Sequence, residues 1–179
     1  MKKIVTIGPE STGKSMLCEQ LAAHYKTVWC PEYAREYLLK YGMSYTYDDL
    51  LTIARGQLRL EDEIENRNAK IENKNAPYFI DTNMYVMKVW CEYVFGNCHK
   101  YILEQIVERK YDLYLLCNID LPWVKDELRE YPDLESRQKL YSIYKDILIN
   151  QDVPWVEVTG NYEERFNIAV NAVDKLISS

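Results

Sequence analysis

The sequence predicts an α/β fold, in which a parallel sheet of five strands is covered by helices on both faces. Short apolar runs alternate along the chain with longer segments of helical periodicity. A glycine-rich turn follows the first of these runs, which is typical of a strand, loop and helix that bind phosphate. At 179 residues the chain has the size of one domain. We therefore expect a single domain over residues 1–179.

The expected strands are apolar runs that end at a glycine, a proline or a polar residue. They cover residues 4–7, 27–30, 77–81, 112–117 and 153–158. Because helical segments separate these runs, the strands are expected to pair in parallel.

The expected helices lie between the strands, at residues 16–25, 32–40, 46–74, 101–109, 135–149 and 162–177, with another after residue 81. Thr46 is expected to cap the long helix, with Asp49 as its capping-box partner. Residues 61–74 are mostly charged or amide residues, which predicts a solvated face.

Residues 8–15 match the phosphate-binding pattern G-x-x-x-x-G-K-S. Gly8 and Gly13 let backbone N–H groups approach a phosphate, since no side chain intervenes. Lys14 supplies a mobile positive charge, and the Ser15 hydroxyl is expected to hold Mg²⁺. These features predict a three-layer P-loop NTPase fold that binds ATP and Mg²⁺. The expected nucleotide-binding residues of this loop are Gly8, Glu10, Ser11, Thr12, Gly13, Lys14 and Ser15.

Polar residues also follow the later strands, at Glu32, Asp81, Asn118 and Thr159. Ligands of parallel sheets bind beyond the carboxyl ends of the strands, so these residues are expected to converge. Asp81 is the expected partner of Ser15 in holding Mg²⁺. Thr159 is expected to lie at the adenine edge of ATP.

The residues after Asp81 indicate the reaction class. Thr82 stands where a hydrolase carries a carboxylate that activates water, which favours transfer to a substrate hydroxyl over hydrolysis. Residues 81–84 also lack the glycine of the D-x-x-G pattern of GTP-binding switches.

The irregular charged segment at residues 118–134 precedes the helix expected at 135–149, and a lid is expected over approximately residues 119–137. A closing loop excludes water and brings arginines to the phosphoryl group that is transferred. Arg129 and Arg137 are the candidates for this role.

Together these stretches resemble the ribosylnicotinamide kinase domain of the bacterial NadR proteins over nearly the whole chain. The matching stretches are residues 8–15, 31–37 and 79–83, Trp123-x-x-Asp126-x-x-Arg129 and Tyr162-x-x-Arg165. The resemblance implies an ATP- and Mg²⁺-dependent kinase that phosphorylates the 5′-hydroxyl of nicotinamide riboside to give nicotinamide mononucleotide. Glu127 is a departure, because the family's lid often has glycine there.

The resemblance also implies roles for individual residues. Glu32 occupies the position where related nucleoside kinases place the base that accepts the sugar hydroxyl proton, and Asp81 is the competing base. Arg35 follows Glu32 by about one helical turn and is expected to pair with it or to bind phosphate. Nicotinamide riboside is a cation, so aromatic rings would suit its pyridinium ring. The candidates are Tyr33, Tyr37, Trp90 and Trp123, although Trp90 also lies on an apolar helical stripe, which is typical of a core position.

Composition argues against several other classes. The net charge of −6 does not favour binding to nucleic acid or to an anionic membrane. The five cysteines form no C-x-x-C motif, which is typical of reduced thiols, and nothing in the sequence has the length of a membrane span or a signal peptide. We therefore expect a cytoplasmic protein with a small-molecule substrate. The alternatives are an ATP-binding regulatory module and a kinase for another nucleoside-like molecule.

Overall fold

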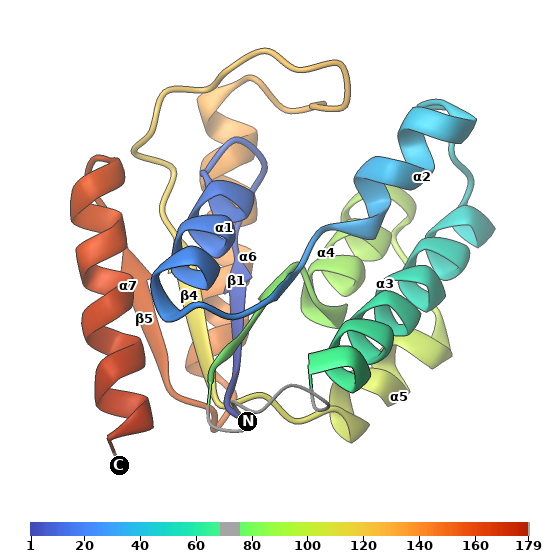
Figure 1. Ribbon diagram of the computed structural model, residues 1–179. Helices are drawn as coiled ribbons and strands as arrows, with labels where there is room; N and C mark the ends of the chain where they lie inside the picture. The colour runs from blue at the N-terminus through green and yellow to red at the C-terminus, as the bar shows by residue number, and fades with distance from the viewer. Residues whose placement is uncertain (69–75, 179) are drawn as a thin grey trace.

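The computed structural model describes residues 1–68 and 76–178, and in this part of the chain five strands form one parallel sheet (Figure 1). The strand order is β2-β3-β1-β4-β5. The strands are β1 (Lys3–Ile7), β2 (Trp29–Cys30), β3 (Tyr78–Asp81), β4 (Leu113–Cys117) and β5 (Trp155–Val158). The predicted α/β fold is thus confirmed, with the phosphate-loop strand at the centre of the sheet.

The helices are α1 (Lys14–Tyr25), α2 (Tyr33–Tyr41), α3 (Tyr47–Asn68), α4 (Met84–Phe95), α5 (Lys100–Glu108), α6 (Leu134–Ile149) and α7 (Tyr162–Ile177). Positions 69–74 of the predicted long helix lie outside the described residues. The predicted capping box at the start of α3 is confirmed. The Thr46 N–H donates to Asp49 Oδ2 over 2.7 Å, and the Asp49 N–H donates to Thr46 Oγ1 over 3.3 Å.

Alternating side chains of the central strands divide the core into two layers. Ile4 and Phe79 pack with buried residues of α1 and α7 on one face of the sheet, whereas Val5 and Ile80 pack with α4 and α6 on the other. Helices α2, α3 and α5 pack with α4 in a third cluster on the β2 side of the sheet (Figure 1). The carboxyl ends of the strands stay open between these layers.

The predicted solvated face of α3 is wrong at Glu61. This carboxylate is fully buried at the amino end of the sheet, where it accepts hydrogen bonds from the Tyr111 hydroxyl at 3.1 Å and from Arg109 at 3.4 Å. Lys3 Nζ lies 3.9 Å away. Burial raises the pKa of Glu61, and the nearby cations oppose that shift. The ionic partners come from β1 and from the α5–β4 loop, far away in the sequence, so a local composition argument could not detect them.

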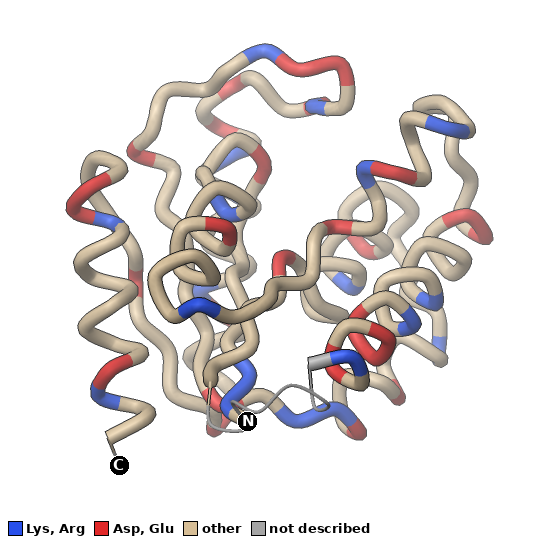
Figure 2. The backbone as a smooth tube through the Cα atoms, in the orientation of Figure 1, with Lys and Arg blue, Asp and Glu red and all other residues tan. Residues whose placement is uncertain are grey.

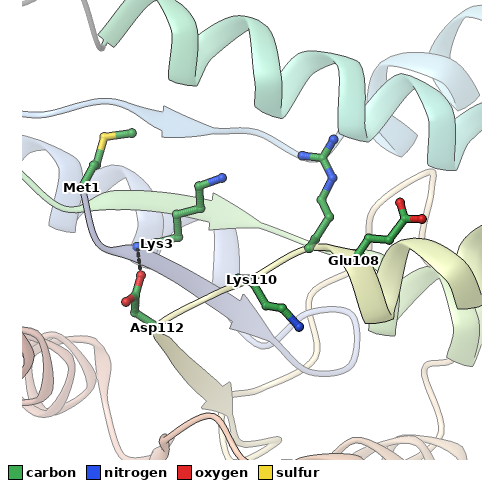
Figure 3. Close-up of a pocket in the computed structure, with 6 residues that line it drawn as sticks. Met1, Lys3, Glu108, Lys110 and Asp112 are labelled. Carbon is green, nitrogen blue, oxygen red and sulfur yellow. Dashed lines mark hydrogen bonds between the residues drawn. The ribbon is translucent and has the colours of Figure 1, made fainter.

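A pocket of about 420 Å³ opens at the same end, lined by Met1, Lys3, Glu108, Arg109, Lys110 and Asp112 (Figure 3). Two of its cationic groups already have acidic partners, because Arg109 donates to both oxygens of Asp62 and Lys3 Nζ donates to Glu65, while Lys110 Nζ donates to the carbonyl of Val107. The pocket lies at the end of the sheet opposite the phosphate loop, so it is not a candidate for the predicted chemistry.

Charges of both signs are interspersed along the described chain (Figure 2). Within residues 1–68 and 76–178, none of the helices combines the length and hydrophobicity that crossing a bilayer requires.

Candidate active site

The phosphate loop connects β1 to α1 and has a backbone that few residues adopt. Gly8 has a φ of +142°, and a Cβ atom there would lie 2.7 Å from the carbonyl oxygen of Cys117 in β4. Gly13 has a φ of +78° and precedes the first turn of α1. Lys14 Nζ bends back over the loop and donates to the carbonyl of Pro9 at 2.7 Å. The loop therefore combines a helix N-terminus with a positive charge, the arrangement that binds phosphate.

Ser15 and Asp81 meet at the carboxyl ends of β1 and β3. The Ser15 hydroxyl donates a short hydrogen bond to Asp81 Oδ2. Asp81 is 1% exposed, and its Oδ1 atom lacks a hydrogen-bond partner among the residues that the structure describes. Burial raises the pKa of Asp81, whereas the charge of Lys14 and the bond from Ser15 lower it. A buried carboxylate oxygen with a free lone pair beside a hydroxyl fits the oxygen ligands that Mg²⁺ prefers.

Glu32 lies close to this pair. It precedes α2, is half-buried, and accepts a hydrogen bond of 3.4 Å from the hydroxyl of Thr82. Thr82 itself has a positive φ of 78° directly after Asp81. Burial and the charge of Asp81 raise the pKa of Glu32, and Lys14 opposes them. The two carboxylates predicted as alternative bases thus belong to one electrostatic unit with Lys14.

A cavity of about 610 Å³ joins these groups, a size within the usual range of small-ligand sites. One part is formed by the phosphate loop. The other is lined by side chains of α2, α4 and the segment before α6, among them Arg35, Trp90, Tyr93, Arg129 and Tyr131. The cavity therefore has a phosphate-binding half and a half with aromatic and charged walls, which we call the acceptor half.

Residues 3–165 match the AAA domain family. The chain belongs to this family. The AAA domain is 29% identical over 182 residues to the trifunctional NAD biosynthesis/regulator protein NadR of Salmonella typhimurium, and 28% identical to that of Escherichia coli. Each match covers 99% of this chain and 43% of the relative, so the chain spans less than half the length of these proteins. The resemblance to NadR that the motifs indicated is confirmed.

Solved structures share the fold of this AAA domain. A crystal structure of NadR in complex with NR has a TM-score of 0.74 at 22% identity, over 99% of this chain and 50% of that one. A thymidylate kinase from Ehrlichia chaffeensis has a TM-score of 0.68 at 13% identity, over 96% of this chain and 98% of that one. The chain therefore shares its fold with both of these proteins.

The AAA domain carries an irregular segment, residues 118–133, between β4 and α6 (Figure 1). We call it the lid segment. Its first anchor is Glu10 of the phosphate loop, which accepts the N–H groups of Glu130 at 3.0 Å and Tyr131 at 2.7 Å. Trp123 Nε1 also donates to Glu10, over 3.3 Å. The lid segment is thus hydrogen-bonded to the phosphate-binding half of the cavity.

A second set of anchors lies on the acceptor side. Arg35 of α2 donates to both oxygens of Asp126, over 3.3 and 3.0 Å. The Tyr45 hydroxyl donates to Glu130 at 2.9 Å and accepts from Trp90 Nε1 at 2.9 Å. The hydrogen bonds from Arg35 hold the pKa of Asp126 below its usual range. The lid segment therefore spans the cavity between two walls.

Most predicted site residues line this cavity, but five do not. Among the described residues, those absent from its lining are Tyr33, Tyr37, Trp123, Arg137 and Thr159. The ring of Tyr33 lies against Gly56, and Trp123 faces Glu10. Thr159 directly follows β5.

The lid predicted over residues 119–137 extends too far, because α6 begins at Leu134, one residue before the predicted helix at 135–149. Arg137 thus belongs to a helix and is 5% exposed, and it donates to the carbonyls of Ile119 at 3.4 Å and Leu121 at 3.3 Å. Arg137 therefore holds the first residues of the lid segment in place from α6, and it is not itself part of the lid segment.

Arg165 has a structural role that sequence reasoning missed. Its side chain, 3% exposed, donates to the carbonyls of Thr12 at 3.0 Å, Asn118 at 2.8 Å and Gly160 at 2.8 Å, and also to Asp120. One guanidinium therefore holds the phosphate loop, the end of β4 and the start of α7 together. The Tyr162-x-x-Arg165 spacing marked the residue without indicating this function.

We expect Asp81→Asn to need far more Mg²⁺ for half-maximal activity, because the amide removes a negative charge from the site that the Ser15 hydroxyl shares. Activity titrations with Mg²⁺ and Mn²⁺ at saturating ATP measure this. Asp152→Asn, at an exposed turn, is the control. Unchanged metal dependence in Asp81→Asn would remove Asp81 from the metal site.

We expect Glu10→Gln to loosen the lid segment. The glutamine amide is uncharged, so it accepts the N–H groups of Glu130 and Tyr131 more weakly than the Glu10 carboxylate does, and its NH₂ group cannot accept them at all. Trypsin should then cleave after Lys125 and Arg129 about 10-fold faster, as expected for the loss of roughly 1.4 kcal/mol. Peptide mapping over time measures the rate. Glu19→Gln, at an exposed position of α1, is the control. Equal cleavage rates in Glu10→Gln and wild type would contradict the role of Glu10 as an anchor of the lid segment.

Proposed function

We propose that this AAA domain is an ATP- and Mg²⁺-dependent kinase that transfers the γ-phosphoryl group to the 5′-hydroxyl of nicotinamide riboside, giving nicotinamide mononucleotide. The observation that carries the proposal is the shared cavity. It sets Lys14 and the Ser15–Asp81 pair beside Glu32 and an aromatic acceptor half. The similarity to NadR over the whole chain supports the same activity, and the fold shared with a NadR–NR complex agrees with it.

The residues of the phosphate half have distinct roles in the proposed transfer. The loop amides and Lys14 bind the phosphates of ATP, and Arg129 neutralises the charge of the group in transit. Ser15 and Asp81 would hold Mg²⁺, which when bound offsets phosphate charge. The β–γ bridging bond breaks as the new oxygen–phosphorus bond forms, and ADP leaves.

Glu32 is the proposed base. Its carboxylate, aligned by Thr82, accepts the proton of the 5′-hydroxyl as the oxygen attacks. Its raised pKa suits the role, since a carboxylate with a higher proton affinity is a stronger base. Asp81 remains the competing base, although the proposed metal role would use the free lone pair of its Oδ1 atom.

The acceptor half suits a cationic ring. Trp90, Tyr93 and Tyr131 line it, and the rings of Tyr93 and Tyr131 meet edge to face at 5.3 Å. Glu130 contributes a carboxylate to the same wall. Aromatic faces and a nearby negative charge attract a pyridinium cation.

A coupled ADP-release assay over a panel of nucleosides tests the proposal. Nicotinamide riboside should give the highest kcat/KM, and mass spectrometry should detect nicotinamide mononucleotide. Preference for another nucleoside would assign a different acceptor. ADP release that no nucleoside stimulates would instead favour an ATP-binding regulatory module.

A further inference from the structure

The turn that carries Glu32 is held by another helix. Glu32 is the N-cap residue of α2, yet within the described chain its side chain makes no capping hydrogen bond. An N-cap carboxylate ordinarily accepts a backbone N–H of the first helical turn. Here the carboxylate faces the cavity and Thr82. The backbone N–H of Tyr33, the first residue of α2, also has no acceptor within the helix.

Gln57 of α3 supplies that acceptor. Its Oε1 atom accepts the Tyr33 N–H at 2.7 Å, and its Nε2 atom donates to the Pro31 carbonyl at 3.3 Å and to the Cys30 sulfur at 3.4 Å. The side chain is 1% exposed. A single buried amide thus binds the peptide groups on both sides of Glu32.

Gly56 makes this approach feasible. A Cβ atom at that position would lie 2.0 to 2.5 Å from ring atoms of Tyr33, so the ring packs directly on the backbone of α3. Because Gly56 and Gln57 are adjacent, this close packing brings the start of α2 within reach of the Gln57 amide.

We propose that Gln57 is a positioning residue, which binds the peptide groups on both sides of Glu32 and thereby orients the Glu32 carboxylate toward the acceptor hydroxyl. This inference rests on the proposed function, since it assigns Gln57 an effect on the step that Glu32 performs. Small displacements of a catalytic group cost up to about 100-fold in rate. Loss of the Gln57 hydrogen bonds should therefore lower kcat more than it weakens binding of ATP.

The test uses Gln57→Met, which keeps the length and volume of the side chain but removes both hydrogen-bonding groups. Gln151→Met is the matched control. Gln151 is half-buried at the turn after α6, and it donates to the carbonyls of Leu148 and Val153 and accepts the Val153 N–H. Both variants lose an amide that binds backbone groups, but only Gln57 lies beside the proposed base.

Gln57→Met should lower kcat by about 10- to 100-fold, with KM for ATP changed less than about twofold. Gln151→Met should lower Tm about as much as Gln57→Met does, but it should keep the kcat of wild type. The double variant Glu32→Gln/Gln57→Met should have the same kcat as Glu32→Gln alone. Gln57 acts on kcat only by orienting the Glu32 carboxylate, so its loss has no further effect once that carboxylate is removed.

Multiplicative losses in the double variant, or wild-type kcat in folded Gln57→Met, would overturn the inference while leaving the kinase assignment intact. A wild-type chain that phosphorylates no nucleoside would overturn the proposed function and the inference with it.

Discussion

Phosphoryl transfer should be nearly abolished in Lys14→Ala, with kcat lowered by at least about 10²–10³-fold. Lys14 bends over the phosphate loop, where its charge can meet the phosphates that the loop amides bind. The same charge lowers the proton affinity of Glu32 and Asp81, so its loss raises the pKa of both carboxylates and reduces the fraction of the proposed base that is ionised. The variant should combine a lost phosphate contact with a base that is more often protonated.

Steady-state kinetics and thermal unfolding of Lys14→Ala measure these effects. The domain should stay folded, because Lys14 belongs to none of the buried apolar clusters. Lys100→Ala, which removes an exposed lysine at the start of α5, is the control. Turnover like that of wild type in Lys14→Ala would refute the phosphate site.

Glu32→Gln should lower kcat by about 10²–10⁴-fold while ATP binding is retained. Glutamine keeps the shape and still accepts the hydrogen bond from Thr82, but it cannot accept a proton. Glu36→Gln, one turn along α2 and exposed, is the control. Steady-state kinetics with varied acceptor and an ATP titration separate the two effects.

The pH profile gives a second readout for Glu32. Burial and the charge of Asp81 raise its pKa, so wild-type kcat/KM should decline as the pH falls through a value above the usual glutamate pKa of about 4.3. Glu32→Gln should lack this acid limb. Normal turnover of Glu32→Gln, together with loss of turnover of Asp81→Asn at saturating metal, would assign the base to Asp81.

The fold and the phosphate site could be predicted because their signals are local. The Thr46–Asp49 capping box, the loop glycines and the periodicity of α7 each depend on neighbouring residues. The convergence of Asp81 and Glu32 followed from the rule that strands of a parallel sheet end at one edge.

The remaining features depend on contacts between distant segments. Glu61 is charged and helical, yet it is buried because Arg109 and Lys3 come from other elements. Arg137 was predicted to reach the transferred phosphoryl group, whereas its side chain is buried and donates to the carbonyls of Ile119 and Leu121. The Gln57 amide lies 24 positions from its partner Tyr33. No periodicity or motif at these positions indicates such pairings.

The lid segment has one further consequence, because it is bonded to both walls of the cavity. Glu10 holds it to the phosphate side, and Arg35 holds it to the acceptor side through Asp126. A ligand that shifts the lid from one wall also changes its contacts with the other. Linkage requires the effect to be reciprocal, so the factor by which ATP changes the affinity for the acceptor equals the factor by which the acceptor changes the affinity for ATP.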